Sequence, residues 1–202
     1  MQLGDIARLT AGVITGRVLV DARKDKEEST GFGIRVLVPK AIHDGKVDHS
    51  LLESQELQRD RKTGEEKNVD NFRTKEGDIV IKLSSPYDSC IINREDEGLL
   101  VPSFCLRITD IDEEKVDRYF LLAYFHSKTF LEEIRKKCYG NVMALAKKSD
   151  FEKISVPDIP LCEQTAIGER FRRIGELKEA VRRYSSLEEE RLDRILEEAR
   201  KC

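Results

Sequence analysis

The sequence has no surplus of positive charge and no long apolar run. Its 202 residues carry a formal net charge of −3, whereas proteins that hold DNA by phosphate contacts alone usually have a clear excess of lysine and arginine. No apolar run approaches the roughly 18 residues of a membrane span, and the opening residues MQLGD lack the basic and apolar stretches of a signal peptide. We therefore expect a cytoplasmic protein that contacts nucleic acid, if at all, through local loops or with a partner's positive surface.

Metal-binding and catalytic motifs are also missing. The five cysteines form no CxxC pair, so neither a disulfide framework nor a structural zinc site is indicated. The stretch HDGKVDH (43–49) lacks the ligand order of HExxH or EF-hand sites, and surface histidines explain it better. There is no GxGxxG, P-loop or GxSxG motif. The sequence thus predicts no catalytic residue, no metal site and no cofactor in this chain.

Apolar runs separated by turn residues predict a β-rich region in the first two thirds of the chain. Alternation over LGDIARLTAGVITG (3–16) predicts a strand that ends in a turn, and Pro39 breaks the β-branched run GIRVLVPKAI (33–42). Later strands are clearer, and SSPYD (84–88) between the first two of them has turn composition. These strands are GDIVIKL (77–83), SCIIN (89–93) and LLVPSFCLRI (99–108), with ISVP (154–157) as a last short one.

Helical segments are expected after these strands. The stretch VDRYFLLAYFHSKTFLEEIRKKC (116–138) places apolar residues on one helical stripe, and Ser127 is positioned to cap a second helical piece. Further along, Ser149 and Glu152 have the spacing of a capping box. The stripe consists of Leu121, Leu122, Phe125, Phe130, Leu131 and Ile134.

The C-terminal segment predicts one long helix from Gln164 to Lys201. Its apolar residues recur nine times over 32 residues, which is the period of a helix surface. At 1.5 Å per residue the helix would be about 57 Å long. The recurring residues are Ile167, Phe171, Ile174, Leu177, Val181, Tyr184, Leu187, Leu192 and Ile195, followed by Ala199.

A helix of this length with one apolar stripe needs a second helix beside it. The chain predicts only one such helix, so the partner is expected in a second molecule, with Ile167 to Ile195 of the stripe as dimerisation residues. Lys178, Ser185 and Glu188 interrupt a strict heptad, which argues against a regular supercoil. The alternatives are a bend at Ser185–Ser186 or a helix that folds back as a hairpin near Tyr184.

In order, and over essentially the whole chain, these segments resemble half of a type I restriction–modification specificity subunit. The most specific part is the run from Gly140 to Ile167 placed directly before a long helix. The matching segments are LGDIARLTAG (3–12), VPKAIHDGKVD (38–48), EGDIVI (76–81), VPSFCLRI (101–108), YFLLAYFHS (119–127) and YGNVMALAKKSDFEKISVPDIPLCEQTAI (139–167). Such subunits have two target recognition domains, and this chain has one.

The resemblance implies an α+β fold, with a mixed-sheet target recognition domain at 1–158 and a spacer and dimerisation helix at 159–202 that pairs antiparallel with another helix. It implies a non-catalytic subunit that reads double-stranded DNA as a homodimer. DNA methyltransferase and restriction/translocase subunits would join it, and S-adenosylmethionine, ATP and Mg²⁺ would bind to those partners. Two-fold symmetry favours a palindromic, interrupted target. The alternatives are a helix-dimerised DNA-binding or adaptor module without such partners, and an enzyme with an unrecognised site.

Polar and basic residues in the turns after strands are the expected DNA contacts. Arginine and lysine can bind guanine, asparagine can bind adenine, and serine can bind base or phosphate. A solvated surface position is the simpler interpretation of any one of them alone. The candidates are Thr15, Arg17, Lys82, Ser84, Ser85, Tyr87, Lys136, Lys137, Tyr139, Asn141, Lys147 and Lys148.

Overall fold

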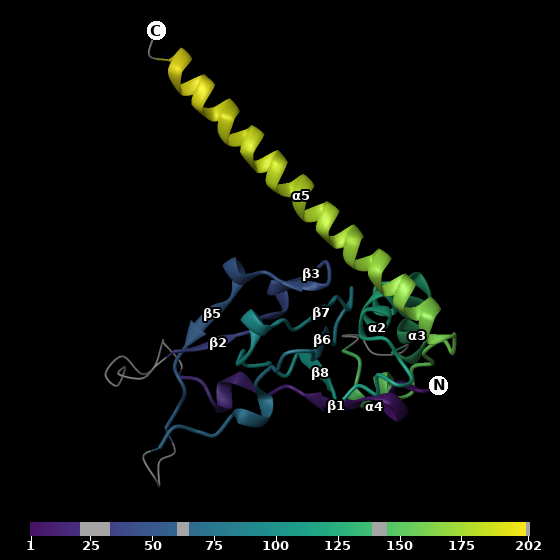
Figure 1. The fold of residues 1–202 in the computed structure, drawn as a ribbon. Helices are drawn as coiled ribbons and strands as arrows, with labels where there is room; N and C mark the ends of the chain where they lie inside the picture. The colour runs from purple at the N-terminus through teal and green to yellow at the C-terminus, as the bar shows by residue number, and fades with distance from the viewer. Residues whose placement is uncertain (21–32, 60–64, 139–144, 201–202) are drawn as a thin grey trace.

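A computed structural model describes residues 1–20, 33–59, 65–138 and 145–200. The chain forms an α+β domain from which one long helix extends, with the C-terminal end of that helix far from the domain (Figure 1). The expected α+β class is confirmed. Among the described helices, none is both long and apolar enough to cross a membrane.

A four-stranded sheet forms the centre of the domain. Its strands pair antiparallel in the order β1-β8-β6-β7. The two inner strands are nearly continuous apolar runs because side chains on both of their faces are buried. Parallel contacts occur as isolated bridges such as Val13 to Pro102, so the expected mixed sheet is not found among the named strands described here. The bounds are β1 Arg8–Ala11, β6 Ile79–Lys82, β7 Ser89–Ile91 and β8 Cys105–Thr109.

Two of the strand predictions are confirmed, and three are wrong in part. The strands predicted at 77–83 and 89–93 are β6 and β7. At the N-terminus, residues Leu3–Ile6 form the short helix α1, because Leu3 and Ile6 are both buried at helical spacing. The strand predicted at 99–108 begins only at Cys105, after Pro102, which has no N–H for a ladder. In the segment 154–157, Ser155 makes a single bridge to Gln2 instead of a strand.

Two small hairpin-like sheets cover one side of the central sheet (Figure 1). The first pairs β2 Ile34–Val36 with β5 Glu53–Gln55, and the second pairs β3 Ile42–His43 with β4 Lys46–Val47. Short 3-10 turns lie in several of the connections between strands; Pro39 begins one of them, and the Asp48 side chain caps another. The turns are η1 Thr15–Arg17, η2 Pro39–Ala41, η3 His49–Leu51, η4 Asp70–Phe72 and η5 Arg94–Asp96.

The helical layer packs on the opposite side of the core. Helix α2 (Arg118–Phe125) begins at Asp117, whose carboxylate accepts the Phe120 N–H at 2.8 Å. Ser127 caps α3 (Lys128–Lys137) by accepting the Phe130 N–H at 3.2 Å, as the sequence predicted. The predicted capping box is wrong: α4 (Lys148–Glu152) begins earlier, with the Asp150 carboxylate accepting the Lys147 N–H at 2.8 Å.

Helix α5 runs without interruption from Leu161 to Ala199. It begins three residues before the predicted start because Pro160 supplies the N-cap position and proline is well suited to a helix entry. The helix continues through Ser185–Ser186, so the fold-back hairpin is excluded and the helix is not broken there. Ion pairs one turn apart, such as Arg183–Glu179 at 2.5 Å and Arg194–Glu190 at 3.6 Å, support its exposed faces.

The first turns of α5 are fixed to the domain by Gln164, which is buried. Its carbonyl oxygen accepts the Asp117 N–H at 2.9 Å. Its amide nitrogen donates to the carbonyl oxygens of Lys115 at 3.1 Å and Ile159 at 2.9 Å. One side chain therefore joins α5 to the segment that starts α2.

Close packing continues along the same face of α5. A Cβ atom on Gly168 would lie 2.8 Å from both the Asp117 carboxylate and the Phe120 nitrogen, so only glycine permits this approach. Phe171, three residues on, lies with its ring 5.0 Å from that of His126 and packs on the core. Phe171 was assigned to the dimerisation stripe; it instead contacts its own domain.

Replacing Gln164 with alanine should destabilise the chain by about 3 kcal/mol, because it leaves an N–H and two carbonyl groups without partners in a buried setting. Urea unfolding followed by circular dichroism at a fixed protein concentration measures this. The exposed neighbour Glu163 provides the control, since Glu163→Ala truncates a side chain of similar size that lies in solvent. Equal unfolding midpoints for the two variants would contradict the role given to Gln164.

Candidate nucleic-acid interface and helix surfaces

Three strand-end segments meet at one end of the central sheet. β1 and β6 end where the antiparallel β8 begins, so their loops are brought together. Val13 accepts the Ser103 N–H at 2.8 Å, and Phe104 accepts the Leu83 N–H at 2.9 Å. We call residues 12–17, 83–88 and 102–104, with the segment 145–148 described next, the strand-end surface.

The fourth segment is attached by a further backbone bond, from the Ala146 N–H to the Leu83 carbonyl at 2.8 Å. The end of α3, which is rich in basic residues, also lies close to the 83–88 turn. Cys138, which follows that helix, is a hydrogen-bond partner of Tyr87 in the turn. The basic side chains of this region, Arg17, Arg135, Lys136, Lys137, Lys147 and Lys148, are exposed. Among the described residues this end of the sheet therefore combines loops with positive charge, as a surface for DNA requires.

Tyr87 does not belong to the exposed part of this surface. It is 2% exposed and packs edge-to-face with Phe151, their ring centroids 6.4 Å apart. Burial, with a hydrogen bond to Cys138, raises its pKa to about 12. Its prediction as a DNA contact is wrong, because the ring holds the 83–88 turn against α4 instead of facing solvent.

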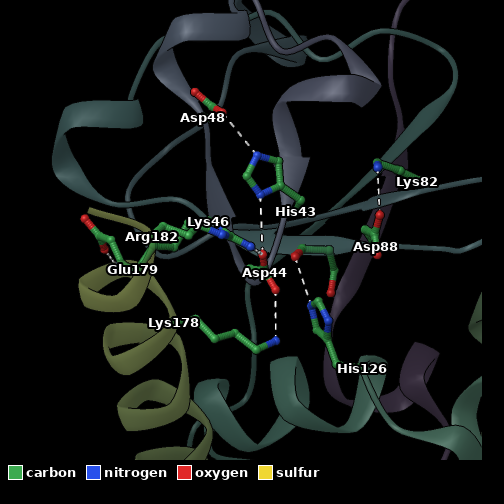
Figure 2. Close-up of polar contacts among 11 residues, drawn as sticks. His43, Asp44, Lys46, Asp48, Lys82, Asp88, His126, Lys178, Glu179 and Arg182 are labelled. Atoms are coloured by element: carbon green, nitrogen blue, oxygen red, sulfur yellow. Dashed lines mark hydrogen bonds and ion pairs between the residues drawn. The ribbon is translucent and has the colours of Figure 1, made fainter. Parts of the chain in front are cut away.

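Lys82 is also engaged within the chain. Its ammonium lies 2.8 Å from the Asp88 carboxylate and is mostly buried (Figure 2). A lysine held in this way positions the turn between β6 and β7, and Ser84 and Ser85 of that turn remain partly or fully exposed. The lysine charge is thereby largely neutralised before any ligand approaches.

The remaining candidates have the following positions. Thr15 is half-buried in η1 and Arg17 is exposed at its end. Lys137 and Lys148 make exposed ion pairs with Glu133 at 3.8 Å and Glu152 at 3.3 Å, which are weak at a protein surface. Tyr139 and Asn141 lie outside the described residues.

Sequence reasoning missed the apolar members of the strand-end surface. Ile14, Phe104 and Leu145 are exposed, although Ile14 and Phe104 were assigned to strands and Leu145 to a short apolar run. For Phe104 a signal was available, because it follows the Pro102-Ser103 break and therefore precedes the strand.

A second polar cluster sets the direction of α5. Asp44 and Gly45 form the β3–β4 turn with φ of 50° and 80°, and Asp44 accepts hydrogen bonds from Arg182 and, at 3.0 Å, from Lys178 (Figure 2). Lys46 lies 2.6 Å from Glu179. We call Asp44, Lys46, Lys178, Glu179 and Arg182 the helix-docking cluster. The Arg182 hydrogen bond, with help from Lys178, lowers the pKa of Asp44 to about 2.

His126 lies beneath this cluster and is mostly buried. Its Nε2 lies 3.1 Å from the Ser89 carbonyl (Figure 2), an arrangement in which the neutral ring donates. Burial lowers its pKa. His126 is therefore a neutral packing partner of Phe171, not an acid or base for chemistry.

One group of described residues has a composition that could hold a metal ion. His49, Glu95 and Asp96 each offer a ligand atom within 4.8 Å of the others. Both oxygens of the buried Asp96 carboxylate already have partners, one at 2.7 Å from His49 Nε2 and the other accepting the Asn93 N–H at 3.0 Å. These contacts join η3 to η5 and satisfy the carboxylate without an ion.

The apolar stripe of α5 faces away from the domain. At roughly 100° per residue, its centre is about 130° around the helix from the line Gln164, Gly168, Phe171. Leu177 and Val181 are 66% and 67% exposed. Beyond Arg182, residues 183–199 extend for about 25 Å without burial against the domain. The exposed members are Ile167, Ile174, Leu177, Val181, Tyr184, Leu187, Leu192 and Ile195, with Leu196 beside them.

Solved structures with the same fold come from type I restriction–modification (R-M) systems. A chain from a study of complex assembly and conformational transition of the type I R-M system is 17% identical, with a TM-score of 0.58 over 96% of this chain. The HsdS subunit from Thermoanaerobacter tengcongensis is 14% identical, with a TM-score of 0.51 over 91% of this chain. The fold is that of a type I specificity subunit, as the sequence resemblance predicted.

This chain spans 42% and 38% of the lengths of those two structures. No protein-family model and no curated protein matches the sequence. The likeness is therefore one of fold, and it covers less than half of each larger chain.

Replacing Asp44 with asparagine should reduce stability by about 1 kcal/mol at neutral pH, after allowance for solvent screening of its exposed partners. Because the folded pKa of about 2 is below the ordinary value of 3.8 for an aspartate, the extra stability of the wild type is present above pH 5 and is lost as pH falls through 2. Urea unfolding at several pH values measures it. Asp70→Asn, which breaks an exposed pair with Arg73, is the control. Identical pH profiles for wild type and Asp44→Asn would contradict the cluster's contribution.

Proposed function

We propose that the chain is the DNA-recognition subunit of a type I restriction–modification system and acts as a homodimer. One observation carries the proposal: the chain has the fold of such subunits over 96% of its own length. The exposed apolar stripe of α5 supports pairing between copies, because a helix with such a stripe needs a second helix beside it.

DNA would bind at the strand-end surface. Backbone hydrogen bonds join its loops, between Val13 and Ser103, Leu83 and Phe104, and Leu83 and Ala146. Loops fixed in this way can present side chains to base edges without a large ordering cost. Arg17, Ser85, Lys147 and Lys148 are its exposed polar candidates.

Two domains joined by an antiparallel pair of α5 helices would bind two half-sites at a fixed separation. The two-fold axis of a homodimer makes the half-sites inverted copies of one sequence. The helix-docking cluster, which ties Asp44 to Arg182 and Lys46 to Glu179, would set the orientation of each domain and hence the spacing.

The chemistry would be performed by other subunits. Methyltransferase subunits would bind S-adenosylmethionine, and a restriction/translocase subunit would use ATP and Mg²⁺, while this chain selects the DNA. A helix-dimerised DNA-binding or adaptor module without these partners is the competing outcome.

The dimer predicts a specific effect of charge on α5. Val181→Glu should raise the dimer dissociation constant at least tenfold, because it buries a carboxylate in an apolar helix contact. Light scattering across a concentration series measures this. Ser186→Glu adds the same charge about 140° away on the helix and should leave the dimer intact. A wild-type protein that is monomeric at tens of micromolar would contradict the dimer.

Mapping methylated adenines in the host genome tests the function directly and should reveal one palindromic, interrupted sequence. On DNA containing it, Arg17→Ala in the methyltransferase complex should weaken binding about tenfold. Arg94→Ala, at the opposite end of the sheet, should change it less than twofold. Methylation without sequence preference would refute the recognition role, and sequence-specific binding without a methyltransferase partner would favour the adaptor alternative.

A further inference from the structure

The exposed apolar side chains of the domain lie in loops that backbone hydrogen bonds join at one end of the central sheet. Among the described residues that precede α5, the large apolar side chains that are exposed are Ile14, Phe104 and Leu145. All three belong to the strand-end surface, although they come from three separate parts of the sequence. Exposed apolar side chains that cluster mark an interaction site more reliably than scattered ones.

Phe104 is held firmly at the centre of this group. Its carbonyl accepts the Leu83 N–H at 2.9 Å, and the next residue, Cys105, donates to the Pro102 carbonyl at 2.9 Å. Two further backbone bonds, from Ser103 to Val13 and from Ala146 to Leu83, fix the neighbouring loops. Ile14 follows Val13 in the chain, and Leu145 precedes Ala146. The ring is 55% exposed on a backbone with little freedom.

The surroundings of these side chains favour nucleic acid as the partner. Exposed basic residues lie close in the sequence to two of the three apolar residues, Arg17 to Ile14 and Lys147 to Leu145. A surface that docks a protein would more often have an apolar centre with mixed charges around it. Positive charge around a small apolar patch instead matches the phosphates and the base edges of one groove.

We propose that Phe104, with Ile14 and Leu145, recognises thymine methyl groups in the major groove. The inference rests on the proposed function and names the feature of the DNA that the patch selects. The thymine C5-methyl is the apolar group that major-groove base edges present, and phenylalanine is among the side chains that contact it. Three side chains from separate loops form a broad patch, which suits contact with groove edges better than insertion between two base pairs.

Uracil-substituted DNA isolates this contact, because deoxyuridine pairs like thymidine and lacks only the methyl group. The assay uses the complete methyltransferase complex and the mapped target, with thymine or uracil in each half-site. Wild type should lose about fourfold in affinity for each contacted methyl group removed. Phe104→Ala should bind thymine DNA more weakly and show little further loss on uracil DNA.

Two variants keep the result interpretable. Phe104→Leu, which keeps an apolar side chain, should retain part of the thymine preference. Arg94→Ala, far from the patch, should retain all of it. Circular dichroism of Phe104→Ala should match wild type, since the exposed ring contributes little to the core.

Several outcomes would overturn the inference. These are equal wild-type affinity for thymine and uracil DNA, and a thymine preference that survives in Phe104→Ala. Fluorescence of 2-aminopurine that rises only when Phe104 is present would identify a wedge that separates bases, which contradicts groove contact. Loss of methyltransferase binding alone in Phe104→Ala would identify a protein-docking patch. Failure of the wild-type complex to bind any mapped sequence would instead refute the proposed function itself.

Discussion

The attachment of α5 to the domain depends first on the buried amide of Gln164. Its three hydrogen bonds join the first turn of α5 to the backbone of Lys115 and Asp117, and Asp117 also caps α2. The amide is both donor and acceptor, so it satisfies an N–H and two carbonyl groups that no apolar residue could. Immediately beyond it, Gly168 lets the helix approach α2 closely. A small rotation here would move the distant end of α5 by many ångströms, because that helix is 39 residues long.

The attachment of α5 at Gln164 and Gly168 also explains why the helix has two different packing faces, one against the domain and one exposed to solvent. Gln164, Gly168 and Phe171 face the domain, whereas Leu177 and Val181 face solvent. Periodicity alone places Phe171 in the same stripe as Leu177, since both fit a 3.6-residue repeat. The domain removes Phe171 from that stripe by packing His126 against its ring. A second helix would therefore pack on the face about 130° around α5 from the line of domain contacts and need not displace the domain.

The parts of the fold that the sequence predicted are those with strong local periodicity. β6, β7, the Ser127 cap and the continuous α5 are local features, and each was visible in a few consecutive residues. Tyr87 was misassigned because SSPYD has the composition of an exposed turn, while the Phe151 ring that buries Tyr87 lies 64 residues away. The gathering of Ile14, Phe104 and Leu145 depends on strand order, which no single segment encodes. Gln164 was expected near the helix start, yet its burial required knowing where α2 lies.

The charge of the chain sets a condition on how it would recognise DNA. With a net charge of −3, long-range attraction to phosphates is weak, and much of the charge on α5 is neutralised in pairs such as Arg183–Glu179. Binding would then depend on the few basic groups near the strand-end surface and on short-range contacts to the bases. Short-range contacts are effective only if the groups that make them are held in place. The backbone bonds that join Val13, Leu83, Phe104 and Ala146 provide that rigidity, so the same bonds that close the end of the sheet also prepare its surface for a specific ligand.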